Sequence, residues 1–290
     1  MIRMEINMHY WIFFMILYGL FKGMREPFKK RALERNDLLD TLFLYTFIGF
    51  LFTIPISKDV FSITPKYLAL VGLKSAVIFG AWMLSFIGVK KLPVSVYGIM
   101  DMSRVLFSTL MGVFVLGEAL TLRGIAGLSL VILGLFMLNL KKSGESSEIK
   151  MKYIWITLLS CAMNAVSGVL DKALMSTGEV TSSQLQFWFM LLLSSMYFIY
   201  IYARGGRVDF KKGLKTPEIY VISALLIFGD KLLFIANSDP ESRVTVMTLI
   251  KQCSVIVTII AGRLIYKEKN IIYKTICAGV IIAGILTAVL

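Results

Sequence analysis

The sequence has little of what enzymes commonly use for chemistry. It contains three cysteines and one histidine among 290 residues, and each cysteine falls inside an apolar stretch. The odd number and the spacing of the cysteines fit no zinc, haem or disulfide pattern. The zinc-protease HExxH, the nucleophile-elbow GxSxG and the phosphate-binding P-loop are all absent from the sequence. We therefore expect no enzyme activity, no catalytic residues, no metal site and no cofactor.

Acidic residues are also scarce, and so are long polar stretches. The chain has 31 Lys and Arg against 18 Asp and Glu, while 57% of its residues are hydrophobic and its mean hydropathy is +0.78. Such a composition is typical of an integral membrane protein. The net charge of +13 is compatible with nucleic-acid binding. The basic residues, however, lie in short gaps between apolar runs, as juxtamembrane Lys and Arg do. We therefore expect a lipid bilayer and no nucleic acid as a partner.

Ten apolar runs, about 15–24 residues long, are interpreted as long enough to cross a bilayer core of about 30 Å. The sequence therefore predicts an all-α integral membrane protein with ten transmembrane helices. The predicted spans are Met8–Lys22, Leu39–Ile56, Lys66–Val89, Pro93–Leu116, Leu122–Leu140, Lys152–Met175, Ser182–Tyr202, Tyr220–Ala236, Ser242–Ile265 and Ile271–Leu290.

The most polar stretch lies at the middle of the chain and divides it into two halves of five spans. We expect residues 1–140 to form the first five-helix repeat, residues 141–151 a linker and residues 152–290 the second repeat. A shift of 150 positions places Asp101 on Lys251 and Gly134 on Gly284. An odd number of spans in each half turns the second half upside down in the bilayer, which predicts inverted repeats around a central cavity.

The loop charges give a predicted orientation. One set of alternate loops, which includes Arg25 and Lys29, holds nineteen Lys and Arg residues, and the opposite set holds five. Because cytoplasmic loops carry an excess of Lys and Arg, the basic loops are predicted to be cytoplasmic. Both termini are then outside a multi-pass protein of the cell (cytoplasmic) membrane.

Several charged residues fall within the predicted spans. Each would cost roughly 3 kcal/mol if it faced lipid, so we expect them to face one another or a watery cavity. Lys22 and Lys274 lie near predicted helix ends, where a long side chain can reach the interface. The residues deeper in the spans are five basic and three acidic ones: Lys74, Arg104, Lys172, Lys231, Lys251, Asp101, Asp171 and Asp230.

Helical spacing places many of these residues on shared faces. Tyr97, Asp101 and Arg104 follow an i, i+4, i+7 pattern on one helix, and a second stripe includes Asn164 and Asp171. Such stripes from several helices predict a common binding site. The candidate substrate-binding residues are Lys74, Trp82, Tyr97, Asp101, Arg104, Asn164, Asp230, Lys231, Lys251 and Gln252.

Two interpretations of the buried charges stay open. They can be structural ion pairs, in which Asp101 holds Lys251 or Arg104. The surplus of two basic residues instead favours an anionic ligand, loss of a proton from a Lys, or both. Asp101 is also a candidate proton carrier. Glu118 and Glu268, just before spans five and ten, are interpreted as charges that complement the N-termini of those helices.

Short motifs support a family resemblance. Lys91–Val96, Leu116–Glu118, Gly127 and Leu133–Gly134 resemble the EamA-like domain of the drug/metabolite transporter (DMT) superfamily. The resemblance covers nearly the whole chain, and each five-helix half is similar to one EamA-like repeat. It implies ten helices around a central cavity and transport of small organic solutes by alternating access.

A further stretch, residues 248–252, is similar to the organophosphate and nucleotide-sugar branch of that superfamily. There a Lys near the position of Lys251 binds phosphate and a second basic residue often follows, whereas this chain has Gln252.

We therefore expect a secondary-active transporter for a small organic anion, with phosphorylated compounds among the candidates. One alternative is a proton-coupled exporter of amino acids or drugs. An alternative of another class is a lipid-handling or scaffold membrane protein. The expected partners are a small-molecule substrate, a coupling proton or counter-substrate and the bilayer, for a monomer or a homodimer.

Overall fold

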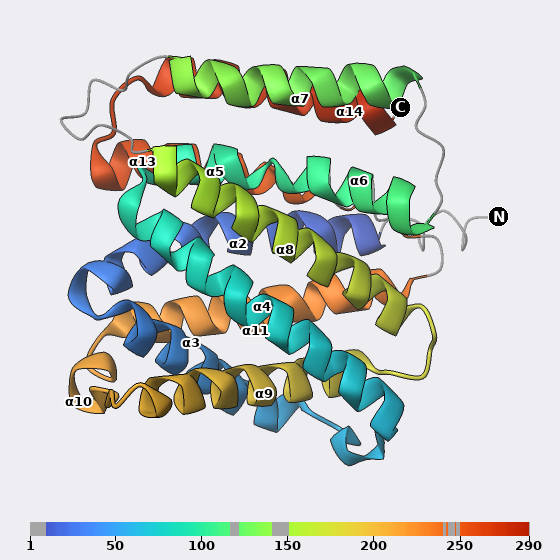
Figure 1. The fold of residues 1–290 in the computed structure, drawn as a ribbon, viewed down its shortest axis with the longest axis vertical. Coiled ribbons are helices and arrows are strands. Elements are labelled where there is room, and N and C mark those ends of the chain that lie inside the picture. The colour runs from blue at the N-terminus through green and yellow to red at the C-terminus, as the bar shows by residue number, and fades with distance from the viewer. Residues whose placement is uncertain are drawn as a thin grey trace.

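The computed structural model describes residues 10–116, 122–140, 151–239, 242, 247 and 250–289, and within these ranges the chain is helical with no strand. Figure 1 shows the long helices running side by side. Their bounds are α2 Tyr10–Arg35, α3 Leu38–Thr53, α4 Pro65–Lys91, α5 Val94–Asp101, α6 Arg104–Leu116, α7 Leu122–Leu140, α8 Met151–Met175, α9 Ser182–Ala203, α10 Phe210–Gly213, α11 Pro217–Ser238, α13 Cys253–Tyr266 and α14 Ile271–Val289; short 3₁₀ turns span Ile54–Ile56 and Val60–Ser62.

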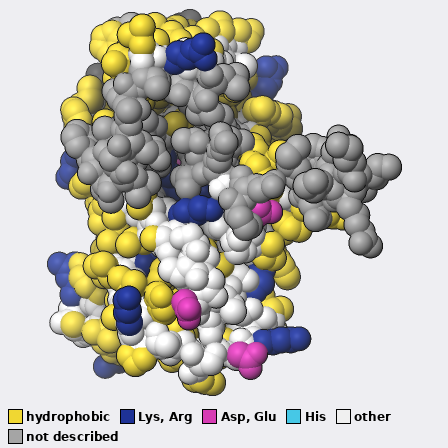
Figure 2. Space-filling model, turned by 90° about the vertical axis from the view of Figure 1, so that its right-hand side faces the viewer, with side chains coloured by type: hydrophobic (Ala, Val, Ile, Leu, Met, Phe, Trp, Pro, Cys, Tyr) yellow, Lys and Arg dark blue, Asp and Glu magenta, His cyan; other side chains and the backbone are white. Residues whose placement is uncertain are grey.

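Five helical segments are long and apolar enough to cross a membrane, namely Leu38–Ile56, α4, α8, α9 and α11. Large hydrophobic side chains also lie exposed on the outside of the molecule, among them Leu122, Ile272 and Leu264, which are 83%, 77% and 73% exposed. Hydrophobic side chains cover much of the flanks in Figure 2. A surface of this kind is stable against lipid rather than water, so the chain is a multi-pass membrane protein.

The first helix is longer than the sequence predicts. The predicted span ended at Lys22, but α2 continues through Pro27 to Arg35. Arg25 and Lys29, which the charge bias assigned to a loop, therefore lie in a helix. Proline removes a backbone donor from a helix interior, and the carbonyl of Pro27 itself accepts a hydrogen bond from the Tyr266 hydroxyl at 2.9 Å.

The helices pack in pairs that join the two halves of the chain. Helix α2 packs against α11 and α13, while α8 packs against α4, α5 and α6. Helix α3 packs against α9 and α11, and α4 packs against α9. Helices α7 and α14 pack against each other and form an outer layer at the top of Figure 1. The remaining helices thus surround the centre of the molecule.

The α7–α14 pair depends on close backbone approach. A Cβ atom added at Gly284 would lie 2.7 Å from the Gly127 carbonyl oxygen, and one at Gly134 would lie 2.5 Å from a side-chain carbon of Ile281. Small residues allow membrane helices to approach in this way. Gly134 and Gly284 are also the two glycines that the shift of 150 positions aligns.

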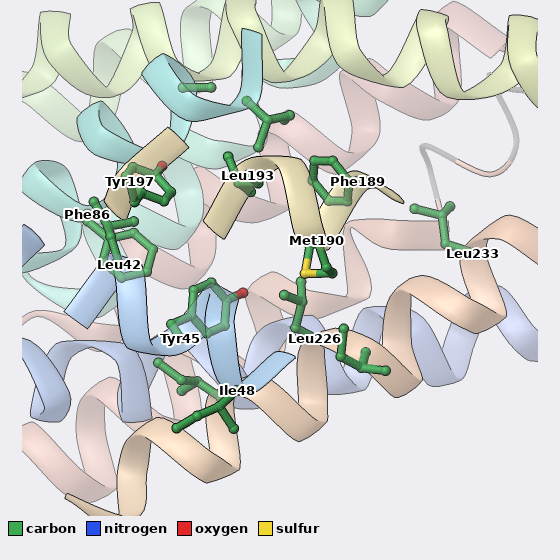
Figure 3. Close-up of a cluster of buried hydrophobic side chains, with 14 of the residues drawn as sticks. Leu42, Tyr45, Ile48, Phe86, Phe189, Met190, Leu193, Tyr197, Leu226 and Leu233 are labelled. Atoms are coloured by element: carbon green, nitrogen blue, oxygen red, sulfur yellow. The ribbon is translucent and has the colours of Figure 1, made fainter. Parts of the chain in front are cut away.

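The main hydrophobic core lies between α3, α4, α9 and α11. Figure 3 shows part of it, with Tyr45, Phe86, Phe189 and Leu226 among its buried side chains. One buried polar group inside it is paired, since the Tyr197 hydroxyl donates to the Phe79 carbonyl at 2.9 Å. Several of these core side chains also form one wall of a polar cavity, so the core fixes the shape of that cavity.

Candidate functional site

A cavity with about 1200 Å³ of empty space, part of it open to solvent, lies between α2, α4, α5, α6, α8 and α11. Its wall carries six basic and four acidic side chains together with tyrosines, serines and amides. The charged lining residues are Lys22, Arg25, Lys29, Lys74, Arg104, Lys251, Glu26, Asp101, Asp171 and Asp230. A charged, partly open cavity inside an apolar helical body is the kind of place where membrane proteins bind polar solutes.

Nine of the ten predicted site residues line this cavity, from Lys74 and Trp82 on α4 to Lys251 and Gln252 near α13. The exception is Lys231, which the structure places outside the lining set. Its ammonium group donates to the Ser183 hydroxyl on α9 at 2.7 Å. Adjacent residues on a helix point about 100° apart, so Asp230 can face the cavity while Lys231 faces away.

Helix α2 contributes four charged lining residues that the predicted site lacked. They are Lys22, Arg25, Glu26 and Lys29. Tyr18, Lys22 and Arg25 follow the same i, i+4, i+7 pattern as Tyr97, Asp101 and Arg104, and Lys29 lies one turn further on the same face. This helical spacing is present in the sequence, but the high density of positive charge in the segment predicts a cytoplasmic loop there instead.

Asp101 is held by two basic side chains. Its carboxylate lies 2.5 Å from the Lys22 ammonium and 2.7 Å from the Arg104 guanidinium. The prediction that Lys22 reaches out to the membrane interface is therefore wrong, since its side chain is only 7% exposed. The structure supports the pairing of Asp101 with Arg104 and not with Lys251.

Two further carboxylates are also paired. The Lys74 ammonium lies 2.9 Å from Asp171 and 3.6 Å from the centre of the Phe189 ring. The Lys29 ammonium donates to Glu26 at 2.8 Å, and the Arg25 Nε lies 3.9 Å from the same carboxylate. These pairs offset the cost of placing charges in a low-dielectric interior.

Asp230 and Lys251 differ from these pairs. Within the described part of the chain, neither has an oppositely charged partner within 4.0 Å. The Lys251 ammonium lies 5.6 Å from the centre of the Tyr18 ring. The Nε groups of Arg25 and Arg104 are buried, and neither has a hydrogen-bond acceptor among the described residues. Buried donors without acceptors are costly, and an anionic ligand removes that cost.

Two helices are interrupted where they pass the cavity. Helix α5 ends at Asp101 and α6 begins at Arg104, with a turn at Met102 and Ser103. The helical residue Lys251 is followed by a turn at Gln252, after which α13 begins. A shift of 150 positions aligns the two interruptions. Broken helices beside a central cavity expose backbone groups that can bind a solute.

The other charged residues within the spans have structural partners. Lys172 donates to the Asn237 carbonyl at 3.1 Å and to the Ser242 carbonyl at 3.2 Å, near the C-terminal end of α11. Lys274 is buried rather than interfacial, with its ammonium 2.9 Å from Glu268. The prediction that Lys274 reaches out to the interface is therefore also wrong.

Glu268 also contacts a helix other than the predicted one. Its carboxylate accepts a hydrogen bond from the Val94 amide at 2.6 Å and one from the Ser95 hydroxyl, at the start of α5. It therefore complements the N-terminus of α5, a role that the sequence did not indicate. Glu118 lies outside the described residues. Within the described ranges, no group of three or more His, Cys, Asp or Glu side chains could hold a metal ion.

Comparisons with known proteins agree with this architecture. A solved structure, described only as a crystal structure of a protein, superposes with a TM-score of 0.62 over 95% of each chain at 14% sequence identity. That similarity concerns the fold alone. No curated protein matches the sequence.

The comparison with protein families concerns the first half of the chain. Residues 9–140 match the model of the EamA-like transporter family. The match covers α2 to α7, and thus the helices that contribute Lys22, Lys74 and Asp101 to the cavity. Residues 9–140 of this multi-pass membrane protein are therefore similar to the EamA-like transporter family of the drug/metabolite transporter superfamily, whose members transport small molecules.

Proposed function

We propose that the protein is a secondary-active transporter that moves a small organic anion across the cytoplasmic membrane by alternating access. The observation that carries this proposal is the cavity wall, which combines six basic with four acidic side chains and leaves Lys251 without a carboxylate within 4.0 Å in the described chain. A surplus of positive charge in a low-dielectric site favours an anionic occupant.

The arrangement of three basic groups supports a binding site near Tyr18. Lys251 lies against the ring of Tyr18, and the charges of Arg25 and Arg104 also act on the hydroxyl of that tyrosine. Guanidinium groups match the geometry of carboxylates and phosphates, whereas an ammonium acts as a compact point charge. Together these three groups suit a carboxylate, a sulfonate or a phosphate ester.

The packing supports two inverted five-helix repeats, residues 1–140 and 152–290, joined by the linker 141–151. Under the shift of 150 positions, α2 corresponds to α8 and α4 to α11. The contact of α2 with α11 then corresponds to the contact of α8 with α4. Contacts of α2 with α13 and of α8 with α6 correspond in the same way. Such a twofold relation between halves is typical of transporters that alternate access around a fixed site.

The helix interruptions at Met102 and Gln252 are suited to serve as hinges. At each, a helical residue of the cavity wall, Asp101 or Lys251, is followed by a turn and then by a helix. A few residues that absorb a change of backbone angles are enough to re-aim a helix. We propose that re-aiming at these two points exposes the cavity to one side of the membrane and then to the other, with the basic loops in the cytoplasm and both termini outside.

A ligand-stabilisation screen tests the proposal. Purified protein would be heated with carboxylates, sulfonates and phosphate esters, and with neutral and cationic compounds of similar size at constant ionic strength. An anion present at about 100 times its dissociation constant should add about 2.7 kcal/mol of stability. If only cations or neutral compounds stabilise the protein, the anion assignment is wrong.

Matched variants assign the effect to the cavity. Lys251→Ala should lose the stabilisation by anions, while Lys231→Ala should retain it, because Lys231 lies outside the cavity wall. Uptake of the stabilising anion into proteoliposomes then separates a transporter from a lipid-handling or scaffold protein.

The alternative of a proton-coupled exporter of amino acids or drugs with Asp101 as the carrier has weaker support. Two basic side chains hold the Asp101 carboxylate at 2.5 and 2.7 Å. A carboxylate in such pairs is stabilised in its ionised form. A proton carrier in this cavity is therefore better sought at another carboxylate.

A further inference from the structure

Asp230 is an acidic residue of the cavity that belongs to none of the ion pairs described above. Glu26, Asp101 and Asp171 each have a basic nitrogen within 3 Å: Lys29 at 2.8 Å, Lys22 at 2.5 Å and Lys74 at 2.9 Å. Asp230 has no such nitrogen within 4.0 Å among the described residues, yet it is only 9% exposed and lines the cavity. An unpaired buried carboxylate is costly as an ion, and binding a proton removes its charge.

The charged and titratable groups around Asp230 come from α2, α3, α4 and α8 and from Lys251. Helix α11 packs against α2, α3, α8 and α9. The charged and titratable groups that act on Asp230, or on which it acts, are Tyr18 and Arg25 on α2, Tyr45 on α3, Lys74 on α4, Asp171 on α8 and Lys251. Two of them, Arg25 and Lys251, are also proposed donors to the anion, so Asp230 and the anion share neighbours.

We propose that Asp230 binds the coupling proton of this transporter, and that protonation of Asp230 and binding of the substrate anion strengthen each other. The inference rests on the proposed function and names its coupling ion. The chemistry is the transfer of one proton from water to a carboxylate oxygen of Asp230, with no other bond made or broken. The proton and the anion then cross the membrane together, and both leave on the other side.

The direction of the coupling follows from the charges. With every group ionised, the cavity wall has six positive and four negative charges, and a proton on Asp230 leaves three negative ones. Ionised Asp230 also attracts Arg25 and Lys251, which the anion needs. Neutral Asp230 no longer competes for them, so the anion binds more tightly. By linkage, the bound anion must favour the protonated form of Asp230 by the same factor.

The test uses sulfonates, whose charge does not change over the pH range of the measurement. The dissociation constants of methanesulfonate and sulfoacetate would be measured on the purified full-length protein from about pH 5.5 to about pH 8.5. The unmodified protein should bind them at least about fivefold more tightly at the acidic end. Asp230→Asn mimics the protonated residue and should bind with high affinity at every pH, while Glu179→Gln, a change at an exposed residue, should keep the pH dependence.

Proton counting gives a second readout. In weak buffer, addition of sulfoacetate near neutral pH should draw protons from solution with the unmodified protein, and the Asp230→Asn variant should draw none. If Asp230→Asn binds anions and keeps the original pH dependence and proton uptake, or if the unmodified protein shows neither, the inference is overturned while the anion site stands. If neither sulfonate binds at any pH, the anion site itself is contradicted, and the inference is lost with it.

Discussion

Asp101 and Lys251 occupy matching places in the two halves of the chain, and their surroundings differ. Each lies at a helix interruption beside the cavity. Asp101 is enclosed by Lys22 and Arg104, which lie 2.5 and 2.7 Å away. Lys251 has the ring of Tyr18 beside it and no carboxylate within 4.0 Å in the described chain. Asp101 therefore connects helices through its ion pairs, whereas Lys251, at the matching position of the other half, is available to bind a ligand.

This difference distinguishes two roles of a charged residue inside a membrane, a structural role and a ligand-binding role. A charge with partners at ion-pair distance contributes to the position of its helices, and its loss leaves the partners uncompensated. A charge without such a partner contributes little to folding and is the better candidate for binding. Substitutions at the two positions should therefore affect different measurements.

The largest expected effect is on the stability of Asp101→Asn. This change leaves Lys22 and Arg104 as buried charges without their carboxylate. Loss of one partner of a buried pair costs about 3–5 kcal/mol. Denaturation of the purified variant should show this loss, and Asp230→Asn is the matched control, since Asp230 has no ion-pair partner within 4.0 Å among the residues that the structure describes.

A second substitution sharpens this prediction. Adding Lys22→Met to Asp101→Asn removes one of the uncompensated charges and should restore part of the lost stability. An Asp101→Asn protein as stable as the unmodified one would show that the pair does not hold α2 against α5.

A smaller loss of stability is expected for Glu268→Gln. The Glu268 carboxylate accepts hydrogen bonds from the start of α5 and pairs with the buried Lys274. The neutral amide keeps part of this network but leaves Lys274 without its counter-charge, so we expect a loss of about 1–3 kcal/mol. Thermal unfolding measures it, with Glu179→Gln as the exposed control. Equal melting temperatures for the two variants would contradict this role of Glu268.

Lys251→Ala should affect binding rather than stability. Because Lys251 lacks a carboxylate partner at ion-pair distance in the described chain, its removal should leave the melting temperature of the unliganded protein nearly unchanged. The affinity for a stabilising anion should fall about tenfold or more, which corresponds to at least about 1.4 kcal/mol. Isothermal titration measures the anion affinity of the unmodified protein and of Lys251→Ala. A variant that unfolds easily but binds normally would reverse the distinction between Lys251 and Asp101.

The smallest effect is expected for Lys231→Ala. Its ammonium donates to Ser183 outside the cavity wall, and a single partly exposed hydrogen bond contributes about 0.5–1.5 kcal/mol. Anion affinity should stay within about twofold of the original, well under a tenfold change of 1.4 kcal/mol. The same titration measures it. A loss of binding as large as that of Lys251→Ala would mean that the structure places the wrong face of α11 toward the substrate.

The sequence was sufficient to predict the cavity-lining residues on helices that carry a clear polar stripe. Tyr97, Asp101 and Arg104 are spaced at helical intervals within an apolar run, and the structure places all three on the cavity wall. Charge in an apolar segment is costly enough that such a stripe must face a polar space. This reasoning needs only the helical period.

The sequence did not reveal the part of the site on α2. Arg25 and Lys29 lie in a segment dense in positive charge and next to Pro27, which together are typical of a helix end followed by a cytoplasmic loop. The structure shows that the helix continues and that its stripe faces the cavity. Helical spacing was the better signal here, because a loop needs no such period.

Pairing between different helices could not be predicted, although Asp101 with Arg104 on one stripe was among the candidate pairs. The sequence provided several basic residues that could have reached Asp101, and the choice depends on the rotation and depth of each helix. Lys22 reaches Asp101 because α2 packs against α5, a contact between segments about 80 residues apart along the chain. Sequence spacing within one helix carries no information on that contact.

Uptake into proteoliposomes tests the central claim most directly. Vesicles with the unmodified protein, with Lys251→Ala or with no protein would receive the same labelled anion, chosen as the strongest stabiliser in the screen. We expect uptake by the unmodified protein and a rate at least about tenfold lower for Lys251→Ala. Equal uptake by these two proteins, or uptake no faster than in protein-free vesicles, would contradict an anion pathway through this cavity.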